Sequence, residues 1–151
     1  MTEQTTRILV TSDGVRLAVR ERGDPRSPTV LCVHGFPDVW DGIAAELGPA
    51  FHVVSYDVRG SGSSDAPRRV RDYRLDRLAE DTLQVIDAVA PAERVHVVGH
   101  DWGSVQAWHL VTGPGQRRIA SMTSISGPCL DHVPSWIRAQ LTARRSRSST
   151  R

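Results

Sequence analysis

Short apolar runs separated by helical stretches constrain the fold of this chain more than any other feature. Residues 29–33, 52–56 and 94–98 are short runs rich in β-branched side chains, with apolar residues at consecutive positions. Such runs are typical of strands buried on both faces in a parallel sheet. A weaker run of the same kind spans residues 122–125. The pattern therefore predicts four strands in this order.

Helical periodicity fills the gaps between these strands. From Trp40 to Leu47 the apolar residues follow an i, i+3, i+4, i+7 spacing, and a longer apolar face runs from Leu75 to Val89. A helix between successive strands predicts right-handed crossovers, hence an α/β fold with a mostly parallel sheet and helices on both faces. In residues 7–20, Asp13-Gly14 between two apolar runs predicts an N-terminal antiparallel hairpin.

Composition narrows the class of protein. With 151 residues and 39% hydrophobic content, the chain is expected to form one globular domain. Its start has no signal-peptide pattern and no later stretch has the length of a membrane span, so we expect a cytoplasmic protein without a membrane partner. Cys32 lies inside an apolar run, which favours free thiols at Cys32 and Cys129 over a disulfide.

The basic residues gather at the C-terminus. The formal net charge is only +2, and residues 142–151 form an Arg/Ser-rich tail with four arginines: Arg144, Arg145, Arg147 and Arg151. A polar run of this composition is expected to be disordered, and without interleaved aromatic residues it does not indicate a nucleic-acid partner. We therefore expect the folded part to span residues 1–141.

One motif carries the strongest chemical signal. Residues 99–103, Gly99-His100-Asp101-Trp102-Gly103, come directly after a predicted strand and directly before a helical stretch. This is the layout of a nucleophile elbow, in which small residues flank a strained central residue two positions away on each side. The elbow would present Asp101 at a helix N-terminus, which stabilises a carboxylate, and would aim the Trp102 N–H at the reacting centre. The simpler alternative is a helix-capping Asp, which the two glycines disfavour.

A second motif follows the first buried strand of the predicted parallel sheet. His34-Gly35-Phe36-Pro37 lies at the carboxyl end of that strand, where ligands gather in open α/β sheets. A loop there can supply a backbone donor, so the Phe36 N–H is the candidate partner of the Trp102 N–H in an oxyanion hole. His34, Gly35, Pro37, Gly99, His100 and Gly103 are then the residues that support the two motifs.

A third motif is glycine-rich and spans residues 57–65. A phosphate-binding loop is the alternative interpretation, but no Gly-Lys-Ser/Thr follows and no helix begins immediately after it. We interpret this loop as structural.

In combination and order, these three motifs resemble those of epoxide hydrolases of the α/β-hydrolase superfamily, from about Thr6 to Leu141. The chain is also similar to the hydrolase portion that some actinobacterial-type proteins carry ahead of a short-chain dehydrogenase domain. The resemblance implies that Asp101 opens a small apolar epoxide at carbon to give an alkyl ester, which a histidine-activated water then hydrolyses. It implies no cofactor and no metal.

Two other functions remain open. Haloalkane dehalogenases share the aspartate and the following tryptophan but usually have Asn at the position of Phe36, which favours an epoxide over a haloalkane. An esterase-like relative is a further enzymatic alternative. A non-catalytic α/β fragment or binding module that retained the elbow by descent is the third.

The resemblance also implies catalytic residues that these 151 residues do not supply. The family's catalytic histidine and its orienting acid follow the nucleophile by far more than the residues that remain after Asp101, and none of the six histidines matches that position. The ring-opening tyrosines would belong to a cap that begins at about residue 128. We therefore expect a truncated chain, inactive alone, whose sheet edge at residues 122–125 is exposed and could promote self-association.

Overall fold

The computed structural model describes residues 4–35 and 40–139. Phe36 and Pro37 of the second motif lie outside these ranges, as does the tail at residues 142–151.

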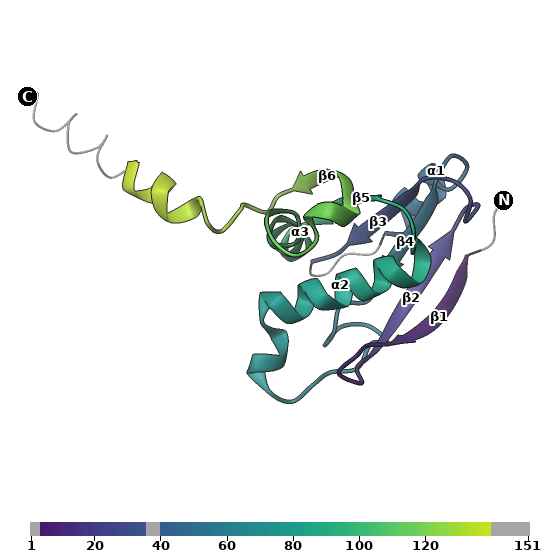
Figure 1. Cartoon of the computed structure of the whole chain (residues 1–151), viewed down its shortest axis with the longest axis horizontal. Helices are drawn as coiled ribbons and strands as arrows, with labels where there is room; N and C mark the ends of the chain where they lie inside the picture. The colour runs from purple at the N-terminus through teal and green to yellow at the C-terminus, as the bar shows by residue number, and fades with distance from the viewer. Residues whose placement is uncertain (1–3, 36–39, 140–151) are drawn as a thin grey trace, which may run out of the picture.

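One mixed sheet organises the molecule (Figure 1). Its six strands lie in the order β1-β2-β4-β3-β5-β6. The pairs β3–β4, β3–β5 and β5–β6 are parallel, whereas β1–β2 and β2–β4 are antiparallel. The strands span Thr5–Val10 (β1), Arg16–Arg22 (β2), Thr29–Val33 (β3), His52–Tyr56 (β4), Val95–His100 (β5) and Ile119–Ile125 (β6). The predicted fold class, a mostly parallel sheet with an N-terminal antiparallel hairpin, is confirmed.

The hairpin turns where the Asp-Gly pair predicted. Gly14 adopts a φ of 83° and its N–H donates to the Thr11 carbonyl at 2.9 Å. A positive φ is a conformation that glycine adopts without steric cost, so this residue permits the tight reversal between β1 and β2.

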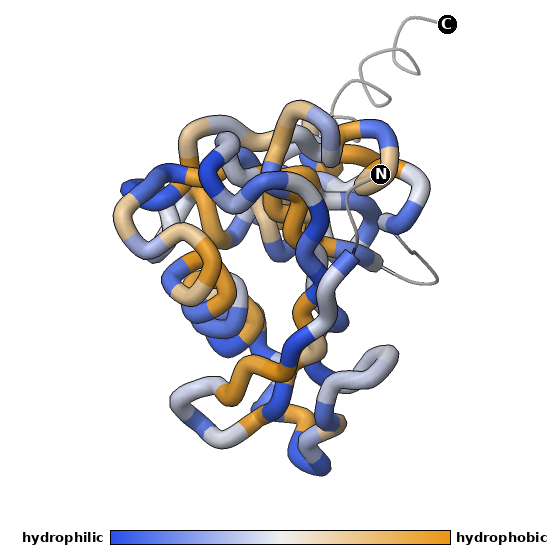
Figure 2. Tube along the Cα trace, turned by 90° about the vertical axis from the view of Figure 1, so that its right-hand side faces the viewer, coloured by the Kyte–Doolittle hydropathy of each residue, from blue (hydrophilic) through white to orange (hydrophobic). Residues whose placement is uncertain are grey.

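Helices cover both faces of the sheet. They are α1 (Asp41–Leu47), α2 (Leu75–Val89) and α3 (Trp102–Thr112), with short 3-10 helices η1 (Val70–Tyr73) and η2 (Gln116–Arg118). Since side chains alternate along a strand, Leu31 and Val33 of β3 enter the core beneath α2 and α3, whereas Val30 and Cys32 pack under α1. In Figure 2, apolar stretches of the chain, in orange, run through the middle of the molecule.

The thiols behave as predicted. Both cysteines are free, Cys32 is buried and Cys129 is half-buried. Burial raises the pKa of Cys32 to about 12, so it remains a protonated thiol at neutral pH.

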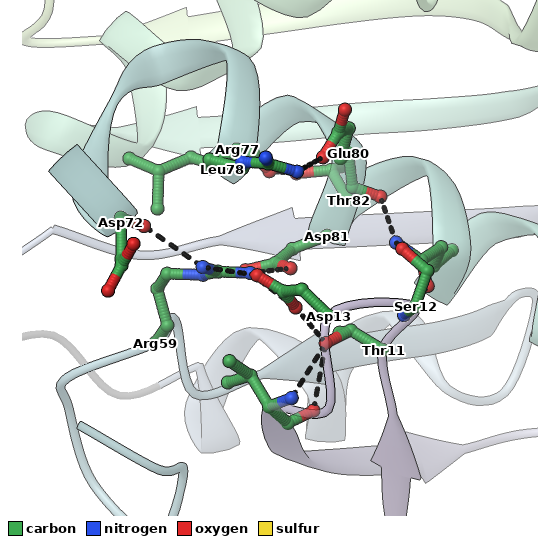
Figure 3. A network of polar contacts seen from close by, with 12 residues as sticks. Thr11, Ser12, Asp13, Arg59, Asp72, Arg77, Leu78, Glu80, Asp81 and Thr82 are labelled. Atoms are coloured by element: carbon green, nitrogen blue, oxygen red, sulfur yellow. Dashed lines mark hydrogen bonds and ion pairs between the residues drawn. The ribbon is translucent and has the colours of Figure 1, made fainter. Parts of the chain in front are cut away.

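A buried ion-pair network ties the glycine-rich loop to the rest of the fold (Figure 3). Arg59 donates to both oxygens of Asp81 on α2 at 2.6 Å, and it also donates to the Asp72 carbonyl at 2.9 Å. Its third partner is Asp13 of the hairpin turn, at 3.0 Å. The side chains of Arg59 and Asp81 are each only 1% exposed. One guanidinium thus holds together three segments that lie far apart in the sequence, which agrees with a structural role for this loop.

At the C-terminal side of the molecule, the last strand of the sheet is exposed. β6 forms one edge of the sheet and most of its residues are exposed. Beyond it, residues 133–139 are helical and extend away from the sheet (Figure 1), leaving Trp136 64% exposed. Within residues 4–35 and 40–139, no helix has the length and apolar character that crossing a membrane requires.

Candidate active site

Asp101 sits on a strained turn between β5 and α3. Its φ and ψ are 51° and −120°, a backbone conformation that residues with a side chain rarely adopt. The Asp101 N–H donates to the Ile125 carbonyl at 2.9 Å, and its own carbonyl accepts from the N–H groups of Ser104 and Val105. The turn is therefore held from β6 on one side and from the first turn of α3 on the other. This is the strand-turn-helix geometry that residues 99–103 predicted.

The two glycines of the motif allow the close packing of this turn. A Cβ atom on Gly99 would lie 2.6 Å from the Gly103 carbonyl oxygen, and one on Gly103 would lie 2.0 Å from the Val33 carbonyl oxygen. Real Cβ atoms do not approach other heavy atoms so closely. Any larger residue at either place would push the elbow away from β3 or from its own helix.

The loop after β3 packs against the carboxylate itself. A Cβ on Gly35 would be 2.5 Å from Oδ2 of Asp101 and 2.9 Å from the Trp102 nitrogen. His34 fixes the course of this loop, because its Nε2 accepts from the Val58 N–H at 3.1 Å. That acceptor role leaves the proton on Nδ1, which donates to the Gly35 carbonyl at 2.6 Å.

Trp102 is the first residue of α3. The N–H of a first helical residue has no acceptor within the helix and is available to an anion beside it. The Trp102 side chain is 61% exposed. The predicted partner donor, the Phe36 N–H, lies outside the described residues, as does Pro37.

A cavity of about 840 Å³ opens beside the elbow. Its volume is typical of small-molecule sites. Gly35 and Trp102 line it and so connect it to Asp101, and its other walls come from Tyr73, Gln106 of α3, and the glycine-rich loop at residues 57–63.

The charges that line this cavity are paired. Arg20 donates to the two oxygens of Asp57 at 2.6 and 3.0 Å, and Arg59 is engaged by Asp81 and Asp13. Burial alone would raise the pKa of Asp57, but the hydrogen bonds from Arg20 and from the Ser63 N–H keep that pKa below its usual value. The cavity therefore presents ion pairs rather than unbalanced charge.

Three of the remaining histidines contact residues that do not line the cavity, and His100, the last residue of β5, is half-buried. His52 is buried against Glu21 at 2.9 Å, His96 contacts Ser121, and His109 on α3 contacts Asp76 on α2 at 2.9 Å. His132 is exposed on the C-terminal segment. Among the described residues, no group of three or more His, Cys, Asp or Glu side chains is placed to hold a metal ion.

Sequence patterns did not identify the support that the segment after β6 gives to the elbow. The Gly127 carbonyl accepts from Ser104, Ser124 and Trp108, at 3.1, 2.9 and 3.3 Å. A Cβ on Gly127 would be 2.5 Å from the Asp101 carbonyl oxygen. The only local signal was a Gly-Pro pair, which marks a turn but does not indicate what the turn contacts.

Comparison with known proteins places the chain in a family. Residues 28–150 match the model of the α/β-hydrolase fold family. Among curated relatives, "Epoxide hydrolase A" of Mycobacterium tuberculosis is 39% identical over 129 residues, which cover 83% of this chain and 39% of that protein. "Probable oxidoreductase EphD" of the same organism is 44% identical over 140 residues, which cover 90% of this chain and 24% of that protein.

Solved structures of epoxide hydrolases have a similar fold. Epoxide hydrolase VrEH1 from Vigna radiata superposes with a TM-score of 0.73 at 29% identity, over 80% of this chain and 37% of that one. Epoxide hydrolase A from Mycobacterium thermoresistibile gives a TM-score of 0.70 at 34% identity, over 80% of this chain and 38% of that one.

The chain belongs to the α/β-hydrolase family. Within it, the sequence is of the epoxide-hydrolase type, and it spans between about a quarter and two fifths of the length of these relatives. By family, therefore, it is an enzyme of the hydrolase class.

Proposed function

We propose that this chain carries the nucleophile of an epoxide hydrolase and that Asp101 attacks a ring carbon of a small apolar epoxide. The observation that carries the proposal is the strained elbow. A carboxylate on a turn with a φ of 51°, next to a helix N-terminus and beside a cavity of about 840 Å³, is positioned for reaction rather than for capping.

In the first step a carboxylate oxygen of Asp101 forms a bond to the epoxide carbon as the bond between that carbon and the ring oxygen breaks. The ring oxygen leaves as an alkoxide and takes a proton from water in the open cavity. The product is a 2-hydroxyalkyl ester of Asp101. Tyr73 lines the cavity, but its hydroxyl donates to the Pro67 carbonyl at 2.8 Å and is engaged in the resting structure.

In the second step water attacks the ester carbonyl, and the N–H groups of Trp102 and Phe36 stabilise the oxyanion that forms. That water requires a general base. Among the described residues His34 is the one histidine that lines the cavity, and its ring nitrogens form hydrogen bonds with the Val58 N–H and the Gly35 carbonyl. We therefore propose that a chain of these 151 residues stops at the ester, and that turnover requires a histidine from outside them.

Mass spectrometry of the chain after incubation with styrene oxide tests both halves of this proposal. We expect one adduct per chain, located on the peptide that contains Asp101, absent in Asp101→Asn, and no diol above the amount that the epoxide forms in buffer alone. Asp101→Asn keeps the size of the side chain and one of its two acceptor oxygens, so its fold should be unchanged by circular dichroism.

Other outcomes would redirect the assignment. Sustained diol formation that Asp101→Asn abolishes would contradict the single-turnover proposal. Halide release from a 1-haloalkane would identify a dehalogenase instead. A folded chain that never acquires an adduct would identify a non-catalytic module.

A further inference from the structure

Two strained turns contact each other at the elbow. In the part of the chain that the structure describes, Asp101 and Ser126 are the two residues other than glycine with a positive φ, at 51° and 57°. The Asp101 N–H donates to the Ile125 carbonyl at 2.9 Å, and a Cβ on Gly127 would lie 2.5 Å from the Asp101 carbonyl oxygen. A strained backbone persists only where the surrounding contacts fix it. Contacts that hold residues 125–127 therefore also hold Asp101.

The side chain of Trp108 provides such a contact from α3. Its Nε1 lies 3.0 Å from the Ser124 hydroxyl oxygen and 3.3 Å from the Gly127 carbonyl oxygen. An indole N–H can only donate, so the Ser124 oxygen faces Trp108 as an acceptor. The proton of that hydroxyl is then available to the Gly127 carbonyl, to which Ser124 donates at 2.9 Å. The indole thus orients the serine, and the serine holds the turn.

Trp108 lies apart from the core and from the cavity beside Asp101. Its side chain is half-buried, and among the described residues neither apolar core cluster includes it, whereas Ala107 and Leu110 of the same helix belong to the larger one. Nor is it one of the described residues that line the cavity. Loss of its N–H should therefore affect the turn after β6 without removing core packing or a substrate contact.

We propose that Trp108 is a positioning residue for the nucleophile. Through Ser124 and the turn at Gly127, it holds the backbone of Asp101 in the strained conformation that presents the carboxylate for reaction. The effect on reaction rate rests on the proposed function of Asp101. The hold on the Asp101 backbone is a separate claim and can be tested without any reaction.

The variant Trp108→Phe keeps an aromatic ring and lacks the donor. With styrene oxide over a range of concentrations, we expect the maximal rate of adduct formation on Asp101 to fall about 10-fold, with the half-saturating concentration unchanged. His109→Gln is the matched control on α3, because His109 contacts Asp76 and not the turn, and it should react as the parent chain does. An unchanged maximal rate in Trp108→Phe would overturn the proposal, as would an effect on the half-saturating concentration alone.

A second variant, Ser124→Ala, tests whether Trp108 acts through the serine. Ser124 is exposed on β6, so its replacement removes the hydroxyl without opening the core. We expect the same loss of maximal rate as in Trp108→Phe, and no further loss when the two changes are combined, because both break one series of contacts. Losses that multiply in the double variant would contradict action through Ser124.

Amide hydrogen exchange, followed by NMR, tests the hold on the backbone without a substrate. In Trp108→Phe we expect the Asp101 N–H, which donates to the Ile125 carbonyl, to exchange about 10-fold faster. The N–H of Val97, a buried residue of β5, should keep its parent rate. Unchanged exchange at Asp101, or equal acceleration at both residues, would show that Trp108 does not act on the elbow specifically. If the parent chain forms no adduct, the role of Asp101 as nucleophile fails, and exchange alone decides the role of Trp108.

Discussion

The backbone of Gly35 lies directly against the carboxylate of Asp101. A Cβ atom at residue 35 would be 2.5 Å from Oδ2 and 2.7 Å from the Cβ of Asp101. The loop after β3 and the elbow after β5 thus form one closely packed unit, and parallel pairing of β3 with β5 brings them to the same edge of the sheet. The absence of a side chain at Gly35 is what permits the approach.

We therefore expect Gly35→Ala to slow adduct formation on Asp101 by about 100-fold, because an added methyl must displace the carboxylate by a large fraction of an ångström. The measurement is the rate of styrene oxide adduct formation followed by mass spectrometry. Gly42→Ala is the matched control, since a Cβ there would meet nothing within 4 Å. An unchanged rate in Gly35→Ala would mean that the loop does not restrict the nucleophile.

Gly103 should be essential for stability rather than for chemistry alone. A Cβ there would lie 2.0 Å from the carbonyl oxygen of Val33. That oxygen belongs to the backbone of the central strand β3 and cannot move aside as a flexible side chain could. We expect Gly103→Ala to lower the free energy of unfolding by about 2 to 3 kcal/mol, measured by urea denaturation. Gly42→Ala, by contrast, replaces a helical glycine in open space and should gain up to about 1 kcal/mol. Similar values for the two variants would contradict the packing argument.

The sequence predicted those features that depend on neighbouring residues. Strands β3, β4 and β5, the hairpin at Gly14 and the helix Leu75–Val89 follow from periodicities and turn signals within a few residues. The elbow at Asp101 was predictable for the same reason, because its strand, glycines and helix are contiguous in the chain.

Features that join distant segments were not predictable in this way. The contacts of Gly127 with the elbow and of Arg59 with Asp13 and Asp81 depend on how the strands are ordered. Gln106 gave no signal, since a glutamine on a helix is ordinarily solvated and only the fold shows that this one is buried. Self-association through β6, whose edge is exposed, stays a prediction.

For the buried ion pair of Arg59 and Asp81, we expect removal of both charges to lower the free energy of unfolding less than removal of one. Arg59→Met leaves the Asp81 carboxylate buried without its partner, and we expect a loss of about 3 to 5 kcal/mol in the free energy of unfolding. Arg59→Met combined with Asp81→Leu removes both charges and should recover a large part of that loss. Urea denaturation of the two variants checks this. A double variant less stable than Arg59→Met would show that the pair itself is a major source of stability.

The carboxylate of Asp57 makes a contribution to the free energy of unfolding that depends on pH. The pKa of Asp57 in the folded protein lies below its usual value of about 3.9, since hydrogen bonds from Arg20 and the Ser63 N–H outweigh the effect of burial. Between the two pKa values the unfolded chain binds more protons than the folded one, so stability rises with pH in that window. The contribution is complete above the unfolded pKa and disappears as the pH falls through the folded pKa.

We expect Asp57→Asn to unfold more easily than the parent chain, by about 1 to 3 kcal/mol at pH 7, with a difference that shrinks steadily below about pH 4. Thermal or urea denaturation across pH 2.5 to 7 measures this difference, with the exposed Glu93→Gln in the loop before β5 as the control. A difference that stays constant across the acid range would mean that the Asp57 carboxylate contributes no proton-linked stability beside the cavity.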